Sequence, residues 1–279
     1  MRSSGAGEGA MTHIALTIAG SDSSGGAGIQ ADLKTFAALG VYGASVIAAL
    51  TAQNTKGVTG IHEVPADFIA KQMDAVFSDL AVGAVKIGML SRAEAIETVA
   101  AGLDRHKAQN IVLDPVMVAT SGDRLLAKDA VEALTRTLMP RAVVVTPNLP
   151  EAAALLGQPI AGNEGEMLEQ ARALMERGAR AVLIKGGHGS GRQSVDLLVE
   201  AGGGVSRLTG RRVATKNTHG TGCTLSSAIA AGLAKGLGLY DAAAAAKAYV
   251  STAIAAADLL EVGHGHGPLN HFYRQWRTS

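Results

Sequence analysis

The chain has 279 residues, enough for one large α/β domain or two small ones, and its 47% hydrophobic content provides for a packed core. Its 25 basic and 24 acidic residues nearly cancel and form no basic block, which excludes the clustered Lys and Arg on which nucleic-acid binding rests. The single cysteine, Cys223, excludes an internal disulfide and a cysteine-rich zinc site and favours a reducing, cytoplasmic location.

The first residues, MRSSGAGEGA, lack the apolar centre of a secretory signal. We interpret residues 1–12 as a disordered extension outside the fold, with Met11 as an alternative start. No linker rich in Pro and Ser divides the rest of the chain. Residues 13–279 are therefore predicted to form a single domain.

Short apolar runs rich in β-branched residues then alternate with helical patterns. Strands are predicted at 14–19, 44–51, 84–88, 110–116, 142–147 and 181–186. Helices are predicted at 27–39, 66–80, 92–106, 127–138, 148–156 and 164–177. Apolar runs without strict alternation are typical of strands buried on both faces. The pattern predicts an α/β fold with a mainly parallel central sheet and helices on both of its faces.

The stretch SVDLLVEAGGGVSRL departs from this alternation. It predicts two strands joined by the glycines at 202–204, as a hairpin near an edge of the sheet. Two helices follow, at about 223–236 and 240–260. The second is rich in alanine rather than leucine and carries three charged residues, so it predicts a packed helix and not a membrane span.

A first glycine loop, GSDSSGGAGIQAD at 20–32, directly follows the first predicted strand. Gly26, Gly28 and Ala31 match the pattern G-x-G-x-x-A of dinucleotide-binding folds. That fingerprint also requires an acidic residue about twenty positions further on, where this chain reads AALTAQN, and no P-loop pattern is found. A close approach of some other ligand and a plain glycine turn both remain open.

A second glycine loop, NTHGTGCT at 217–224, precedes the apolar helical run LSSAIAAGLA. Free N–H groups at a helix start form an anion site, and glycines let them converge without side-chain clashes. Gly220, Thr221, Gly222 and Cys223 are positioned for this role. Phosphate binding and an ordinary helix cap are both compatible with the spacing.

Histidines 264, 266 and 271 raise the question of a metal site. Glycines alternate with the first two, which predicts a flexible turn rather than the helical spacing typical of zinc ligands. A zinc site is therefore not predicted there.

The two glycine loops occur together with DPVM (114–117), TPNLPE (146–151) and KGGH (185–188). In this order the motifs resemble the ribokinase-like superfamily. Together with TAQNT, KIGML and the C-terminal GHGHGPLNHFY, they most closely resemble the hydroxymethylpyrimidine/phosphomethylpyrimidine kinase family of thiamin biosynthesis. The resemblance covers nearly the whole chain, from about residue 13.

This resemblance implies ATP-dependent phosphorylation of a pyrimidine alcohol, followed by phosphorylation of the resulting monophosphate to a diphosphate. It also implies a Rossmann-like three-layer α/β sandwich and, commonly, a homodimer. The first glycine loop is then expected to line the acceptor pocket, and the second to hold the phosphates that are transferred.

The same resemblance assigns roles to individual residues. Gln53 is implied to recognise the ring, because a carboxamide offers both a donor and an acceptor to an aminopyrimidine edge. Each of two residues also has a purely structural interpretation: Asp32 as an exposed charge on the first helix, and Met89 as an ordinary core residue. The residues implied to assist Gln53 are Gly20, Ala27, Asp32, Met89 and the backbone of Val116.

At the phosphate end, Asp114 follows the apolar run IVL at the end of a predicted strand, where open α/β sheets bind ligands. With Glu151 it is implied to hold Mg²⁺, partly through water. Asn148 and Lys185 are implied to contact the nucleotide phosphates, as is Thr221. The alternatives are a helix cap for Asn148 and a solvated side chain for Lys185, while His219 is a weaker phosphate candidate.

Cys223 has two readings. Many ribokinase-like enzymes have an Asp base at the corresponding position, and a thiol pKa of about 8.5 falls at a helix N-terminus, so the resemblance implies a base role. In the other reading Cys223 merely lines the pocket. A base would matter for the first acceptor, a hydroxyl, and much less for the second, an ionised phosphate.

Rival functions remain. Pyridoxal kinase has the same fold, reaction type and a related ring. A non-catalytic ligand-binding protein would keep the fold without the chemistry, although Asp114, Glu151 and the loop at 220–223 argue against it. A dinucleotide oxidoreductase is disfavoured by the missing ribose carboxylate.

Overall fold

The computed structural model describes residues 12–117, 128–187 and 191–276. All but the last residue of the predicted N-terminal extension therefore lies outside the described residues, as does His188 of the KGGH motif.

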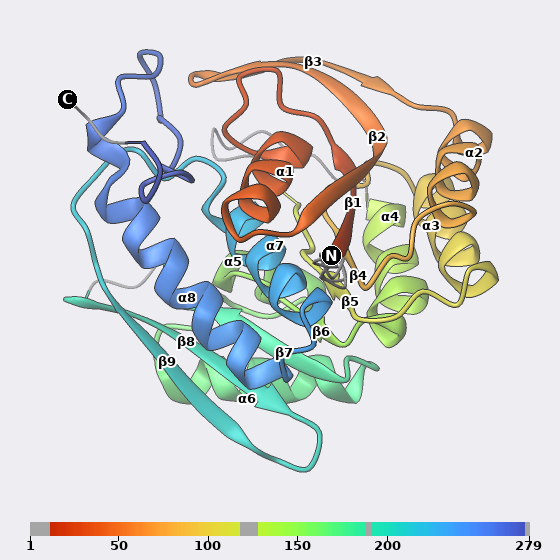
Figure 1. Ribbon diagram of the computed structural model, residues 1–279. Helices are drawn as coiled ribbons and strands as arrows, with labels where there is room; N and C mark the ends of the chain where they lie inside the picture. The colour runs from red at the N-terminus through yellow and green to blue at the C-terminus, as the bar shows by residue number, and fades with distance from the viewer. Residues whose placement is uncertain (1–11, 118–127, 188–190, 277–279) are drawn as a thin grey trace, which may run out of the picture.

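The strands of the described chain form one nine-stranded sheet in the order β3-β2-β1-β4-β5-β6-β7-β8-β9. From β2 to β7 all neighbours are parallel, whereas β3 at one edge and the β8–β9 hairpin at the other are antiparallel (Figure 1). The predictions of a mainly parallel sheet and an edge hairpin are confirmed. The strands are β1 (Ile14–Gly20), β2 (Tyr42–Asn54), β3 (Gly57–Glu63), β4 (Ala84–Ile87), β5 (Ile111–Leu113), β6 (Val144–Val145), β7 (Ala181–Lys185), β8 (Gln193–Glu200) and β9 (Val205–Arg211).

Helices cover both faces of the sheet, with an apolar core on each side. One core packs α2 to α6 against the sheet and contains Leu16 and Ile18 of β1; the other packs α1, α7 and α8 and contains Ala15 (Figure 1). Successive strand side chains point to opposite faces, so a fully apolar strand feeds both cores. The helices are α1 (Gly28–Ala38), α2 (Ala66–Phe77), α3 (Ala93–Arg105), α4 (Lys128–Ala133), α5 (Leu149–Leu156), α6 (Glu164–Glu176), α7 (Thr221–Ala234) and α8 (Leu239–Ala255), with a π turn (Leu134–Leu138) and 3-10 turns (Met139–Arg141, Ala257–Leu259).

The alanine-rich helix α8 packs closely against α7. A Cβ added at Gly232 of α7 would lie 2.9 Å from the Cβ of Ala242, so the small residues allow the two backbones to approach. Ala243, Ala246 and Ala253 of α8 are also buried. The prediction of a packed helix is confirmed, and among the described helices none has the length and hydropathy needed to span a membrane.

Three differences between the structure and the predictions have a local physical reason. Strand β3 was not predicted, because most of its side chains are exposed and it carries no apolar run. The strand predicted at 110–116 ends at Leu113, since Pro115 has no N–H to donate to a sheet. The helix predicted at 127–138 is α-helical only to Ala133 and continues as the π turn.

Candidate active site

A cavity of about 700 Å³ lies at the carboxyl ends of the parallel strands. Gly20 and Lys185 end β1 and β7, and Met89, Asp114 and Asn148 lie just beyond the ends of β4, β5 and β6. Parallel strands bring these positions to one edge, so residues far apart in sequence share one cavity. The predicted site residues that line it are Gly20, Ala27, Gln53, Met89, Asp114, Val116, Asn148, Glu151, Lys185, Gly220, Thr221, Gly222 and Cys223.

Asp32 is the one predicted site residue that does not line the cavity. Its carboxylate is fully buried and accepts hydrogen bonds from Lys86 Nζ at 2.8 and 2.9 Å. Thr17 Oγ1 at 2.6 Å and Ser227 Oγ at 2.7 Å complete its partners. The expectation of a pyrimidine contact is therefore corrected, and so is the alternative of an exposed charge. Helix α1 turns Asp32 inward against β1, where it holds Lys86.

Lys86 was not predicted as a site residue, yet it lines the cavity from β4. Burial lowers the pKa of Lys86, but Asp32, Cys223 and Asp114 together outweigh burial and raise the pKa above its ordinary value. The ammonium group is therefore charged at neutral pH. It lines the cavity as one half of a buried ion pair with Asp32.

The two glycine loops are in direct contact. Gly220 has φ +81°, and a Cβ placed on it would lie 1.9 Å from the carbonyl oxygen of Gly26. A Cβ on Gly26 would in turn lie 2.5 Å from Cδ2 of His219. Only glycine allows this approach at either position. The two loops, about 200 residues apart in sequence, thus form one continuous wall.

Helix α7 begins at Thr221, two residues earlier than predicted, with Gly220 as its N-cap. The amide and hydroxyl of Thr221 both donate to the carbonyl oxygen of Thr218, at 3.2 and 2.7 Å. Within the described chain the amides of Gly220, Gly222 and Cys223 have no backbone acceptor. Three of the four predicted amides are thus available to an anion, and the fourth is already engaged.

Cys223 lies in this first turn and lines the cavity. Burial raises the pKa of Cys223 to about 11, although the charge of Lys86 lowers it. This is opposite to the shift expected from the helix N-terminus alone. Desolvation is the largest cause of this shift, so the pKa of the thiol lies above its ordinary value.

Asp114, Lys185 and Glu151 form a buried charge cluster facing the start of α7. Lys185 Nζ lies 3.0 Å from Asp114 Oδ1 and 3.8 Å from Glu151 Oε2. A Cβ at Gly222 would lie 3.2 Å from Lys185 Nζ, which shows how closely the cluster approaches the helix start. Burial lowers the pKa of Lys185, but the two carboxylates outweigh burial and raise it. Lys185 is therefore an ion-paired cation and not a solvated side chain.

Glu151 and Asn148 also form the capping box of α5. Asn148 Oδ1 accepts from the Glu151 amide at 2.8 Å, and Glu151 Oε2 accepts from the Asn148 amide at 2.7 Å. Burial raises the pKa of Glu151, Lys185 opposes this shift, and Asp114 adds to it. The cap fixes the Glu151 carboxylate toward the cavity, so its structural and its proposed functional role coexist.

Gln53 and Met89 lie at the other end of the cavity. Gln53 is near the end of β2, and its amide and carbonyl pair with Ser23 Oγ of the first glycine loop at 2.9 and 2.8 Å. A Cβ at Gly20 would lie 2.5 Å from the Met89 methyl group, so Met89 covers Gly20. This end combines a carboxamide with an apolar wall, which suits a flat heterocycle.

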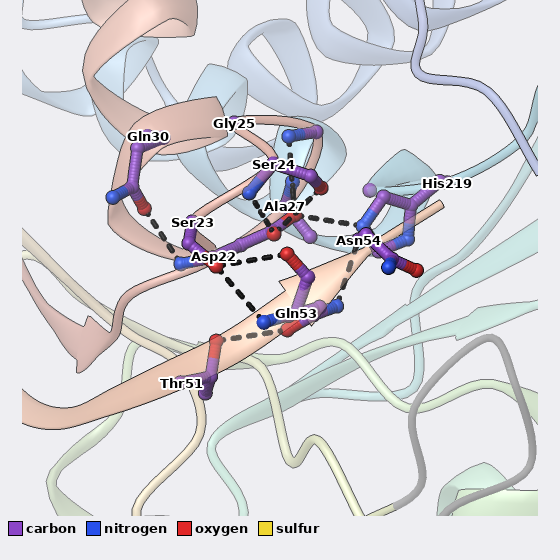
Figure 2. A network of polar contacts seen from close by, with 12 residues as sticks. Asp22, Ser23, Ser24, Gly25, Ala27, Gln30, Thr51, Gln53, Asn54 and His219 are labelled. Carbon is purple, nitrogen blue, oxygen red and sulfur yellow. Dashed lines mark hydrogen bonds and ion pairs between the residues drawn. The ribbon is translucent and has the colours of Figure 1, made fainter. Parts of the chain in front are cut away.

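Sequence reasoning missed the residue that organises the first glycine loop, Asp22 (Figure 2). Its buried carboxylate accepts from the amides of Ser24, Gly26 and Ala27 and from His219 Nε2 at 2.8 Å. An Asp that follows a strand and precedes small residues is typical of an Asx-type turn, and that was the available signal. Its long-range partner, His219, has no local signature.

The cavity also extends beyond Lys185 toward β8, β9 and α8, where no sequence pattern indicated a site. Val213, Val250 and Ile254 provide apolar wall there, beside the ion pair of Lys247 Nζ with Asp196 Oδ2 at 2.7 Å. The edge hairpin and α8 meet only through the tertiary fold. The cavity therefore has two ends, with the start of α7 between them.

Comparison with known proteins relates this arrangement to one family. A family model described as phosphomethylpyrimidine kinase matches residues 22–270. The hydroxymethylpyrimidine/phosphomethylpyrimidine kinase of Rhizobium meliloti (strain 1021) is 62% identical over 267 residues, covering 96% of this chain and 100% of the relative.

Two solved structures are also similar. The phosphomethylpyrimidine kinase from Clostridium difficile 630 is 44% identical with a TM-score of 0.76, covering 86% of this chain and 99% of that one. The pyridoxal kinase from Staphylococcus aureus in complex with AMP-PCP and pyridoxal is 34% identical with a TM-score of 0.87, covering 95% and 96%. Sequence identity is higher with the phosphomethylpyrimidine kinase, whereas backbone similarity is higher with the pyridoxal kinase. Backbone similarity alone therefore does not distinguish these two kinds of kinase.

Proposed function

The chain belongs to the phosphomethylpyrimidine kinase family, and on that premise we propose that it phosphorylates 4-amino-5-hydroxymethyl-2-methylpyrimidine and then the resulting monophosphate in thiamine biosynthesis, with ATP as donor. The ribokinase-like fold implied by the motifs is confirmed. The contact between Gly26 and Gly220 carries the proposal, because it joins the acceptor end of the cavity to the amides of α7.

In the proposed reaction the chain mainly positions its two substrates and balances charge. Gln53 orients the pyrimidine edge so that the hydroxymethyl group faces α7. The amides of Gly222 and Cys223 donate to the migrating phosphoryl group, while Lys185 and Lys86 balance its charge. The apolar end between α8 and the β8–β9 hairpin is the proposed adenine site.

Asp114 and Glu151 fit a Mg²⁺ ion that is shared with the phosphates. Both carboxylates point at Lys185, so their oxygens converge on one region beside α7. No group of three or more His, Cys, Asp or Glu in the described residues is arranged to hold a metal. This agrees with Mg²⁺, which keeps several waters and binds through one or two carboxylates plus phosphate oxygens. When bound, the ion would supply neutralisation of phosphate charge.

The function is tested by a product assay. The purified protein is incubated with the pyrimidine alcohol, ATP and Mg²⁺, and the products are counted by mass spectrometry. We expect a monophosphate that is converted to a diphosphate, with one ADP formed for each group transferred. Absence of any ADP would contradict catalysis. A monophosphate that is not converted further would contradict the two-step assignment.

Pyridoxal kinase is the second candidate, since the Staphylococcus aureus structure is so similar in backbone. Parallel kinetics with pyridoxal, the pyrimidine alcohol and its monophosphate distinguish the two. The second phosphorylation is peculiar to the pyrimidine enzyme, so a high kcat/KM with the monophosphate supports the first proposal. A strong preference for pyridoxal would favour the second.

The role of Cys223 is tested with Cys223→Ala. A thiol with a pKa of about 11 is ionised in only about one molecule in 10⁴ at pH 7, which is too few for an efficient base. We therefore expect similar and modest losses in both phosphorylation steps, measured by single-turnover kinetics. A loss of roughly 10²–10⁴-fold confined to the first step, whose acceptor must lose a proton, would restore the base assignment.

We also propose a homodimer in the cytoplasm. The support is that β2 and β3, at this edge of the sheet, both expose large apolar side chains: Tyr42, Leu50 and Ile61. Exposed apolar side chains on an edge strand favour association with a second chain. Light scattering of the purified protein would report the mass in solution.

A further inference from the structure

The Asp22 carboxylate links the two glycine loops at the acceptor end. It accepts hydrogen bonds from amides of its own loop, the first glycine loop, and from His219 of the second loop (Figure 2). His219 Nε2 also lies 3.4 Å from the carboxamide of Gln53. Asp22 and His219 are 1% and 5% exposed, so water does not replace these contacts.

The protonation of this cluster is determined by Asp22. Burial raises the pKa of Asp22, but the hydrogen bonds from His219 and Ser24 outweigh burial and hold the pKa far below its ordinary value. An ionised carboxylate only accepts hydrogen bonds. Three backbone amides, which can only donate, already point at the Asp22 carboxylate, so His219 Nε2, which faces it at 2.8 Å, carries a proton as a further donor.

The orientation of the Gln53 carboxamide follows from this proton. One of its terminal atoms lies 3.4 Å from His219 Nε2, whose proton is donated to Asp22, and the other lies 3.2 Å from Thr51 Oγ1. The single hydroxyl proton of Thr51 is donated to the Ser21 carbonyl oxygen at 2.9 Å, so Thr51 Oγ1 presents a lone pair to the carboxamide. The group beside Thr51 is then the NH₂ donor, which places the carboxamide oxygen beside the N–H of His219. This order is the reverse of the one drawn in Figure 2, where two donors would face each other.

We propose that Asp22, His219 and Thr51 are positioning residues that determine the donor–acceptor order of Gln53, and thereby the ring chemistry that the acceptor site takes. They act through Gln53 and need not touch the substrate. The proposal rests on the assignment of Gln53 to ring recognition under the proposed function.

The consequence is a preference between two ring edges. A 4-aminopyrimidine presents an NH₂ donor beside a ring nitrogen acceptor, whereas its 4-oxo analogue presents a C=O acceptor beside a ring N–H donor. When Gln53 is held in one order, its oxygen accepts from the 4-amino group and its NH₂ donates to the ring nitrogen. With the 4-oxo analogue, the same order places oxygen against oxygen and N–H against N–H. Unpaired buried groups of this kind allow strong discrimination.

The experiment compares kcat/KM for the first phosphorylation of the 4-amino alcohol and of its 4-oxo analogue. His219→Ala releases one side of the carboxamide, so Gln53 turns over. We expect the 4-amino to 4-oxo ratio to fall by at least about tenfold. His219→Gln retains an N–H donor near the Nε2 position and should keep the ratio within about threefold of the wild type.

Two further variants separate positioning from folding. Thr51→Val removes the hydroxyl contact on the other side of the carboxamide with little change in shape, and it should also lower the ratio. It therefore provides a second test if His219→Ala is insoluble. His271→Ala is the matched control. His271 is also a buried histidine, but it contacts Thr224, the last residue of the second loop, rather than Gln53. Its variant should lose thermal stability and keep the ratio.

The proposal is overturned if wild type, His219→Ala and Thr51→Val share one ratio, or if His219→Gln loses as much discrimination as His219→Ala. These outcomes differ from failure of the proposed function, in which the wild-type protein itself would phosphorylate neither pyrimidine.

Discussion

Gly220→Ala should lower kcat/KM for both phosphorylation steps by at least roughly 10²-fold, the loss typical of misplacing an oxyanion-type donor. The added Cβ would lie 1.9 Å from the carbonyl oxygen of Gly26, which belongs to backbone and has little freedom to move aside. The first turn of α7 or the first glycine loop must shift. Either shift separates the acceptor end from the amides of Gly222 and Cys223. Steady-state kinetics with both acceptors measures the effect.

Gly236→Ala is the matched control for this variant. Gly236 lies just beyond the C-terminus of the same helix at φ +83°, close to the +81° of Gly220, and a Cβ there meets nothing within 4 Å. Both variants therefore bear a similar left-handed backbone strain, and only Gly220→Ala adds the clash. Equal kinetic losses in the two variants would contradict a specific role for the loop contact.

Lys86→Met should lower the free energy of unfolding by about 3–5 kcal/mol, as measured by urea denaturation. Lys86 and Asp32 both have fully buried side chains 2.8 Å apart. Among the described residues, removing the ammonium group leaves the buried carboxylate with two hydroxyl partners, Thr17 and Ser227. Adding Asp32→Asn to Lys86→Met should recover part of the loss, because it removes the uncompensated charge.

Lys71→Met makes the same substitution in an exposed ion pair, Lys71 with Asp67 at 2.9 Å. Its side chains are 67% and 70% exposed, so solvent already screens the interaction and stability should be nearly unchanged. Similar destabilisation by the two Lys→Met variants would show that burial of the Lys86 pair does not determine its contribution.

The prediction from the chain alone was most successful where the signal is local. Apolar runs bounded by glycine and proline indicated the buried parallel strands, since a strand covered on both faces needs no polar alternation. Motifs at the ends of those strands indicated the cavity, because the carboxyl ends of parallel strands share one edge. The strand at Gly57–Glu63 was missed because its side chains are largely exposed.

The site shows the same division. Gln53, Asp114 and Cys223 lie in motifs that resemble a known family, and the structure brings all three to the cavity. Asp32 belongs to the same motifs, but its carboxylate is taken up by Lys86, a pairing across 54 residues that no local pattern reports. The thiol pKa of Cys223 was expected to fall and instead rises, because burial depends on the whole fold.

The chain alone was thus enough to predict the alternation of buried strands and helices, the two glycine loops and the family to which the protein belongs. Propensity, periodicity and close-packed glycines act over a few residues, and they can be read from the chain. The contact of Gly26 with Gly220, the Asp22–His219 pair and the raised pKa of Cys223 became evident only from the folded structure. These depend on distances between distant segments and on exclusion of water, and neither exists until the chain has folded.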